Sequence, residues 1–251
     1  MSYLQAVLDS QRMPNAAENQ IRALRDELES ILRGNWRTGD PRFYYGGSFG
    51  KRTMIREMYD LDLVVYFPPK TQYTVKDFYV AVEQRLQGAR YVTSRHNVAI
   101  RLPYEGGLHI DVVPGRAIAD DYKYANLYAS ERNTTKQTSI KIHIQHVRNG
   151  GNQDIIKLMK VWRLRHQVPI GSFPLELSLE QALKGCRKTS LEDRMWEVLL
   201  FLRDTYLNAR LVDPANGNNV VSDDVSWADK RAVQGAAVVS CQKKNWREIV
   251  W

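Results

Sequence analysis

The sequence contains little of what marks secreted, disulfide-bonded or membrane-spanning proteins. Its 251 residues include only two cysteines, Cys186 and Cys241, too few for a disulfide framework or for a zinc site of the Cys-x-x-Cys kind. No apolar run approaches the roughly 20 residues that cross a bilayer. The first residues lack the basic and then apolar segments of a secretory signal. We therefore expect a cytoplasmic protein.

Histidines in metal-ligand spacing are lacking as well. His143 and His146 lie three residues apart, but no cysteine or second pair accompanies them. Positive charge, in contrast, is in excess: 36 Lys and Arg against 28 Asp and Glu leave a formal net charge of +8. Such a surplus favours a polyanionic partner, namely a nucleoside triphosphate, a nucleic acid or an anionic membrane face.

Hydrophobic spacing divides the chain into a mixed first half and a helical second half. It predicts helices over residues 14–33 and 75–86. The expected strands are residues 43–45, 61–67, 91–94, 98–102 and 108–113. Further expected helices are residues 154–165, 174–183, 191–207 and 224–239. We therefore expect two parts, residues 1–149 and residues 150–251, while the polar stretch 118–136 supports no clear prediction.

Asp60 and Asp62 open an expected strand, in the run DLDLVVYF. Side chains two apart on a strand project from the same face, so the two carboxylates repel each other, and only a cation, a proton or full hydration makes the arrangement tolerable. Asp111, in the later run HIDVVPG, has a similar setting after a hairpin expected at residues 104–107. If its strand neighbours the first, three carboxylates converge, as in sites that hold two Mg²⁺ or Mn²⁺ ions for phosphoryl transfer.

A glycine turn precedes these carboxylates, in the run GGSFGKRT that starts at Gly46. Gly46, Gly47 and Gly50 let backbone N–H groups approach an anion closely, and Ser48 adds a hydroxyl. A phosphate-binding turn upstream of a metal-binding strand is what binding of a nucleoside triphosphate requires.

The order of these runs resembles the DNA polymerase β-like nucleotidyltransferase superfamily, whose signature is a Gly-Ser turn, an acidic strand and a third acidic strand. The second half is similar to the oligoadenylate synthetases and the bacterial cyclic-oligonucleotide synthases (the CD-NTase group). The runs that carry this similarity are IKLMKVW (residues 156–162), GSFPLEL (residues 171–177) and VDPANGNNV (residues 212–220). The resemblance spans roughly residues 40–240. It implies an α+β, bilobed fold with a mixed sheet core, a C-terminal helical lobe and the active site in the cleft.

The resemblance also implies roles for individual residues. Asp60, Asp62 and Asp111 would ligate two Mg²⁺ or Mn²⁺ ions, and Asp111 would help to deprotonate the attacking ribose hydroxyl. Gly47 and Ser48 would hold the donor triphosphate. Lys160, or with less support Lys157, and Ser172 would contact its tail. Trp162 and Trp227 are expected in the core.

The leading hypothesis is a template-independent enzyme that joins nucleoside triphosphates into a cyclic or short linear oligonucleotide, a second messenger of antiviral defence. One alternative is nucleotide addition to an RNA 3′ end, as in archaeal-type CCA-adding enzymes, which usually carry a further RNA-gripping domain that does not follow the last expected helix here. Another is an inactive nucleotidyltransferase fold that binds RNA, although all three carboxylates are present. A minimal toxin-type nucleotidyltransferase fits less well, because those chains are typically shorter. The sequence leaves open the bases, the linkage, the oligomeric state and a requirement for RNA or DNA as activator. It also leaves open whether Arg85, Arg90, Arg95 and Arg101 form a basic face.

Overall fold

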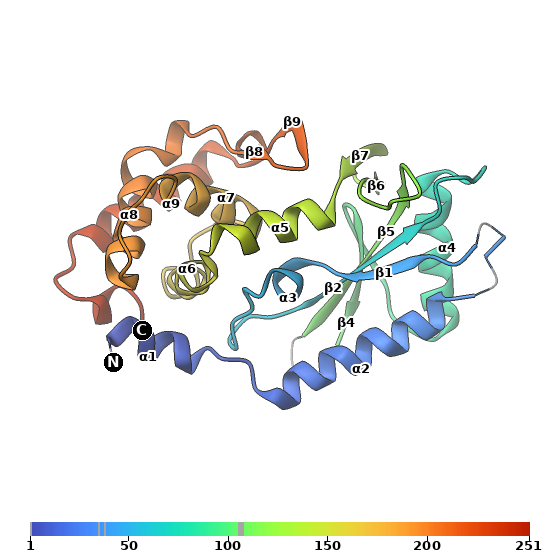
Figure 1. The fold of residues 1–251 in the computed structure, drawn as a ribbon, viewed down its shortest axis with the longest axis horizontal. Coiled ribbons are helices and arrows are strands. Elements are labelled where there is room, and N and C mark those ends of the chain that lie inside the picture. The colour runs from blue at the N-terminus through green and yellow to red at the C-terminus, as the bar shows by residue number, and fades with distance from the viewer. Residues whose placement is uncertain (1, 35, 38, 105–107) are drawn as a thin grey trace. The chain divides into compact units, whose positions relative to one another are not determined.

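A computed structural model describes residues 2–34, 36, 37, 39–104 and 108–251 (Figure 1). The chain forms two compact units. The sheet unit comprises Met13–Met54 and Met58–Gln145, and the helical unit comprises Met1–Arg12, Ile55–Glu57 and His146–Trp251. Among the described residues, none of the helices combines the length and the apolar character needed to span a membrane.

The sheet unit is built on a seven-stranded mixed sheet. Its central path runs β1-β2-β5-β4-β3, and β6 joins β5 to β7. Only the β2–β5 pair is parallel among the pairings of this sheet that are described. The strands are β1 (Arg42–Tyr45), β2 (Leu61–Phe67), β3 (Ser94–His96), β4 (Ala99–Pro103), β5 (His109–Ala117), β6 (Ala125–Ala129) and β7 (Thr134–Thr138).

One face of this sheet packs on two long helices, α2 (Asn15–Leu32) and α4 (Val75–Gly88). Alternate β2 residues from Leu61 to Phe67 join the helices in one apolar core, because side chains alternate across a strand. Val64 and Tyr66 belong to a second, smaller cluster, so Asp62 projects from the face opposite α4. The short helix α3 (Gly47–Lys51) follows β1, and α5 (Ile140–Gly150) follows β7.

The helical unit gathers both ends of the chain. Its helices are α1 (Tyr3–Ser10), α6 (Gln153–Arg165), α7 (Ser172–Ala182), α8 (Leu191–Asp204) and α9 (Trp227–Cys241), with the short 3-10 helices η2 (Tyr206–Asn208), η3 (Val221–Asp224) and η4 (Trp246–Glu248) and the hairpin of β8 (Val212–Asp213) and β9 (Asn216–Val220). Trp162 of α6 is fully buried and donates its indole N–H to Ser240 Oγ at 2.9 Å. Helix α1, within residues expected to belong to the first part, packs here because Leu4, Val7 and Leu8 are buried and Tyr3 donates to the Val250 carbonyl at 2.9 Å.

Several elements differ from the sequence predictions. The strand expected at residues 91–94 begins only at Ser94, because the Tyr91 amide closes α4 by donating to the Leu86 carbonyl. The stretch without a clear prediction contains β6 and the start of β7. Trp227, expected in the core, is 52% exposed because Ser226 caps α9 and makes Trp227 its first residue. Residues 105–107 of the expected hairpin lie outside the described residues, while β4 and β5 on either side pair antiparallel.

Candidate active site

The three carboxylates come together on the sheet face opposite α4. Parallel pairing of β2 with β5 makes Asp62 and Asp111 register partners, so their side chains stand on the same face of neighbouring strands. Asp60 lies immediately before β2, two residues from Asp62. We call Asp60, Asp62 and Asp111 the carboxylate cluster. Asp111 is more buried than Asp60: its side chain is 13% exposed, against 35% for Asp60.

Two basic side chains face this cluster. Arg101 of β4 is the register partner of Asp111 and donates two hydrogen bonds to it, from Nε to Oδ1 and from Nη2 to Oδ2, both at 2.8 Å. His109 Nε2 lies 3.3 Å from Asp60 Oδ2 and 4.0 Å from Asp111 Oδ2. The hydrogen bond to Asp111 is the largest cause that raises the pKa of Arg101, and the charges of Asp60 and Asp62 add to it. All three carboxylates of the cluster therefore favour the charged form of Arg101.

The glycine turn lies directly against Asp62. The Gly46 amide donates to the Asp62 carbonyl at 2.8 Å, and Gly47 has φ +45. A Cβ at Gly47 would lie 1.5 Å from Asp62 Oδ2, so only glycine permits this approach. Ser48 Oγ is buried and finds no hydrogen-bond partner among the residues described. The turn thus contains an unsatisfied hydroxyl at the residue after Gly47, which lies against Asp62.

The other predicted site residues belong to the helical unit. Lys160 is 2% exposed in α6, so it does not lie on a solvated helix face. Lys157 is partly exposed and pairs with Asp154 at 3.2 Å. Ser172 is the first residue of α7, whose N-cap is Gly171, and Ser172 Oγ accepts from Arg163 Nη1 at 3.2 Å. Lys160 is therefore buried, and Ser172 is hydrogen-bonded to a residue of its own unit.

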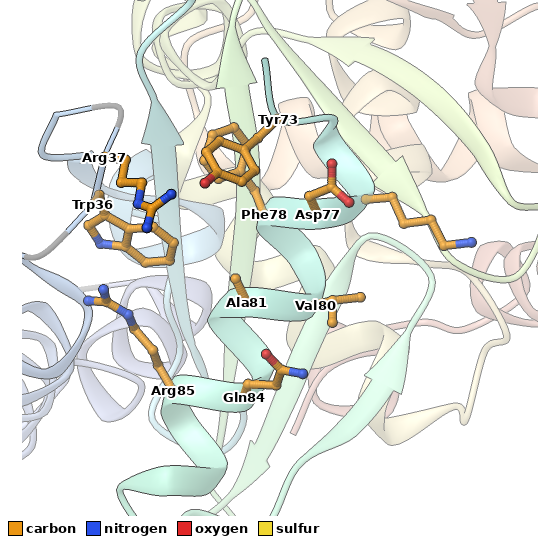
Figure 2. Close-up of a pocket in the computed structure, with 10 residues that line it drawn as sticks. Trp36, Arg37, Tyr73, Asp77, Phe78, Val80, Ala81, Gln84 and Arg85 are labelled. Carbon is orange, nitrogen blue, oxygen red and sulfur yellow. The ribbon is translucent and has the colours of Figure 1, made fainter. Parts of the chain in front are cut away.

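Hollows lie on both faces of the sheet unit. A small recess of about 160 Å³ is lined by Gly46, Gly47, Asp62 and His143, among others, so it adjoins the carboxylate cluster. A larger hollow of about 630 Å³ lies against α4, on the face away from the cluster. Figure 2 shows Trp36 and Arg37 on one side of it and Ala81 of α4 on the other. Arg85, one of the four arginines considered for a basic face, stacks on Trp36 at 3.9 Å there.

These arginines have separate environments. Arg95 forms an ion pair with Glu83 of α4 at 2.5 Å, and Arg101 pairs with Asp111 on the opposite face of the sheet. Sequence reasoning did not identify Arg101 or His109 as site residues. The spacing contains a signal for Arg101: a hairpin that pairs Pro103 with His109 also pairs Arg101 with Asp111. The sequence does not specify this register, which is set by the pairing of β4 with β5.

Within the described parts of the chain, no group of three or more His, Cys, Asp or Glu side chains is arranged to hold a metal ion. The Arg101 guanidinium engages both oxygens of Asp111, while Asp60 and Asp62 supply the hard oxygen donors that Mg²⁺ and Mn²⁺ prefer. The oxygen donors of the cluster therefore fit a divalent cation. Such a cation would meet Arg101 already bound to Asp111.

No known protein-family profile matches the chain. A curated relative, the CBASS oligonucleotide cyclase CdnC of Escherichia coli (strain KTE188), is 24% identical over 227 residues, covering 82% of this chain and 72% of the relative. The solved structure of E. coli MS115-1 CdnC in complex with HORMA-deltaN is 18% identical, with a TM-score of 0.75 over 94% of this chain and 88% of that one.

The cyclic AMP-GMP synthase DncV of Vibrio cholerae, solved with a linear intermediate, also has a TM-score of 0.75, at 14% identity over 95% of this chain and 89% of that one. The Bradyrhizobium diazoefficiens CD-NTase CdnG, solved with GTP, has a TM-score of 0.73, at 14% identity over 94% of this chain and 90% of that one. These similar proteins are nucleotide cyclases and nucleotidyltransferases. The α+β chain, with its mixed sheet and its helical unit, therefore has the CD-NTase-like nucleotidyltransferase fold.

Proposed function

We propose that the protein is a template-independent nucleotidyltransferase that joins nucleoside triphosphates into a cyclic oligonucleotide and releases pyrophosphate. The observation that carries this proposal is the pairing of Asp62 with Asp111 in register, with Asp60 beside them and the glycine turn hydrogen-bonded to Asp62. The relatives named as oligonucleotide cyclases support the type of product. Their similarity also supports a role for that product as a second messenger in antiviral defence.

The residues of the sheet unit divide the work of binding and proton transfer. The unsatisfied hydroxyl of Ser48 donates to a phosphate oxygen of the donor nucleotide, and Gly47 keeps that phosphate close to the cluster. Asp60, Asp62 and Asp111 would hold Mg²⁺ or Mn²⁺ ions, two of them as in other phosphoryl-transfer sites. When bound, such ions acidify the attacking hydroxyl and neutralise phosphate charge.

The transfer itself follows from this positioning. The oxygen of a ribose hydroxyl attacks the α-phosphorus of the donor, and the bond from that phosphorus to the bridging oxygen of the β-phosphate breaks. Pyrophosphate leaves with that electron pair, and a carboxylate oxygen of Asp111 accepts the hydroxyl proton. Contact of Lys160 and Ser172 with the triphosphate tail stays a prediction from the sequence resemblance.

The direct test is incubation of the full chain with the four labelled ribonucleoside triphosphates and Mg²⁺ or Mn²⁺, with and without RNA and DNA. Small phosphatase-resistant products support the proposal, because a cyclic product has no terminal phosphate. Labelled RNA would instead indicate 3′-end addition. Silence under every condition would overturn the enzymatic role and leave a nucleic-acid-binding scaffold.

We expect Asp60→Ala and Asp62→Ala each to abolish product, by 100-fold or more, while the thermal unfolding midpoint stays close to that of the wild type. Product is lost because both carboxylates serve the reacting groups. Stability changes little because Asp60 is partly exposed and Asp62 lies at the start of β2. The matched control is Asp120→Asn, because Asp120 is an exposed aspartate of the same unit that pairs with Lys70 at 3.3 Å. Near-normal turnover in either alanine variant would contradict the assignment.

A further inference from the structure

Arg101 is paired with Asp111, one of the three carboxylates of the cluster. Its guanidinium donates to both carboxylate oxygens at 2.8 Å, in the bidentate geometry that makes arginine–carboxylate pairs strong. Both strands hold the pair in place, because Arg101 of β4 and Asp111 of β5 are register partners. The pair is therefore part of the sheet and not a contact between mobile surface groups.

The environment of this pair differs from that of an ordinary surface ion pair. The side chains of Arg101 and Asp111 are 34% and 13% exposed, so solvent screens their attraction incompletely. The charges of Asp60 and Asp62 also attract Arg101. Arg101 therefore brings positive charge to the three carboxylates, which His109 also faces.

We propose that Arg101 is a positioning residue that holds Asp111 until a divalent ion takes its place, so that ion binding at the carboxylate cluster requires release of the Arg101–Asp111 pair. This inference rests on the proposed function, because it takes the cluster to be the ion site. A divalent ion binds through a lone pair on an oxygen of Asp111, and the bidentate guanidinium already takes one of the two lone pairs on each oxygen, on the side of the carboxylate that faces Arg101. Ion and guanidinium therefore compete for the same carboxylate.

The competition has a measurable consequence in the absence of nucleotide. Arg101→Gln removes the competitor and one positive charge, so the full chain should bind Mn²⁺ alone about tenfold more tightly than the wild type, as measured from the electron paramagnetic resonance signal of free Mn²⁺. Arg101→Lys keeps the charge but cannot donate in the bidentate fork, so its affinity should lie between the two. A pure charge effect would leave Arg101→Lys equal to the wild type.

Arg95→Gln provides the matched control. Arg95 lies on β3, next to β4, and pairs with Glu83 through Nε and Nη2, with the Nε bonds at 3.0 Å. The variant loses the same charge and the same kind of pair, but on the α4 side of the sheet. It should bind Mn²⁺ as the wild type does. Circular dichroism and thermal unfolding of each variant establish that it is folded before titration.

The outcomes separate the two proposals. Tighter Mn²⁺ binding in Arg101→Gln, intermediate binding in Arg101→Lys and unchanged binding in Arg95→Gln support the competition. Equal or weaker binding in Arg101→Gln overturns it while leaving the ion site intact, and so does Arg101→Lys equal to the wild type. Absence of saturable Mn²⁺ binding in the wild type and in Arg101→Gln alike overturns the role proposed for the carboxylate cluster, and this inference with it. As a second readout, the Mg²⁺ concentration for half-maximal turnover should fall in Arg101→Gln.

Discussion

Gly47 is the residue at which backbone conformation and site chemistry meet. Its φ of +45 disfavours any side chain, and its missing Cβ leaves room for the Asp62 carboxylate. The sequence marks this position by its Gly-Gly-Ser pattern, which predicts a tight turn near an anion. The pattern does not reveal that the neighbour across the gap is Asp62, because that contact depends on pairing of β1 with β2.

We expect Gly47→Ala to lower turnover at least 100-fold and to destabilise the fold by about 1–3 kcal/mol, because the positive φ is strained for alanine and the new methyl displaces the Asp62 carboxylate. Product assays and urea unfolding measure the two effects. Gly88→Ala is the control: a Cβ at Gly88, the last residue of α4, meets nothing within 4 Å. Unchanged turnover in Gly47→Ala would show that the turn does not position Asp62.

At the scale of elements, periodicity predicted those that bury one regular face. Helix α2 buries Ile21, Leu24, Leu28 and Leu32 at helical spacing, and β2 begins and ends where its apolar run does. Strand β7 escaped prediction because it is polar and mostly exposed, and the buried strand β6 because its five residues lie within a longer polar stretch. Pairing with β6 and not burial makes β7 a strand. The local sequence pattern therefore predicts elements that bury an apolar face, but not a strand that depends on pairing with its neighbour.

Helix α4 begins with a capping box, in which Thr74 Oγ1 accepts from the Asp77 amide and Asp77 Oδ2 accepts from the Thr74 amide at 2.7 Å. The pKa of Asp77 is lowered first by the hydrogen bond from the Thr74 amide, and then by the one that Thr74 Oγ1 donates to Asp77 Oδ2 at 2.8 Å. We expect Asp77→Ala to cost about 1 kcal/mol of unfolding free energy at pH 7. A carboxyl group whose pKa is lowered by folding stabilises the folded state at pH values above its unfolded pKa of 3.8. This stabilisation is lost as the pH falls through the lower, folded pKa.

The gap between the wild type and Asp77→Ala should therefore narrow below about pH 4. Urea unfolding at several pH values measures it. Gln84→Ala, at an exposed position of the same helix, should change stability by less than about 0.5 kcal/mol at every pH. A gap that stays constant down to pH 2.5 would contradict the role of the ionised carboxylate.

At the scale of the whole molecule, the helical unit is assembled from both ends of the chain. Tyr3 reaches the Val250 carbonyl, and Gln11 hydrogen-bonds Glu57, which also pairs with Arg165. Such contacts join residues far apart in sequence, so no local pattern predicts them. The division expected near residue 150 follows composition, whereas the compact units follow packing, and α1 therefore groups with the C-terminal helices.

Leu4→Ala tests this assembly. Leu4 is fully buried in the helical unit, so its truncation should cost about 2–5 kcal/mol of unfolding free energy in urea. Ala6→Ser, at an exposed position of α1, should cost no more than about 0.5 kcal/mol, which is the difference in helix propensity. Equal stability of Leu4→Ala and the wild type would mean that α1 does not contribute to the core of this unit.

The sequence alone identified the side chains that we propose to carry the chemistry, because carboxylates at alternate strand positions and glycines before a serine are local patterns with local physical causes. It also determined most helices and the central strands, for which hydrophobic periodicity suffices. Only the tertiary structure decided which groups face one another: the parallel register that joins Asp62 to Asp111, and the hairpin register that sets Arg101 against Asp111. Strand pairing links residues across long stretches of chain, and a shift of one position would turn every side chain to the other face.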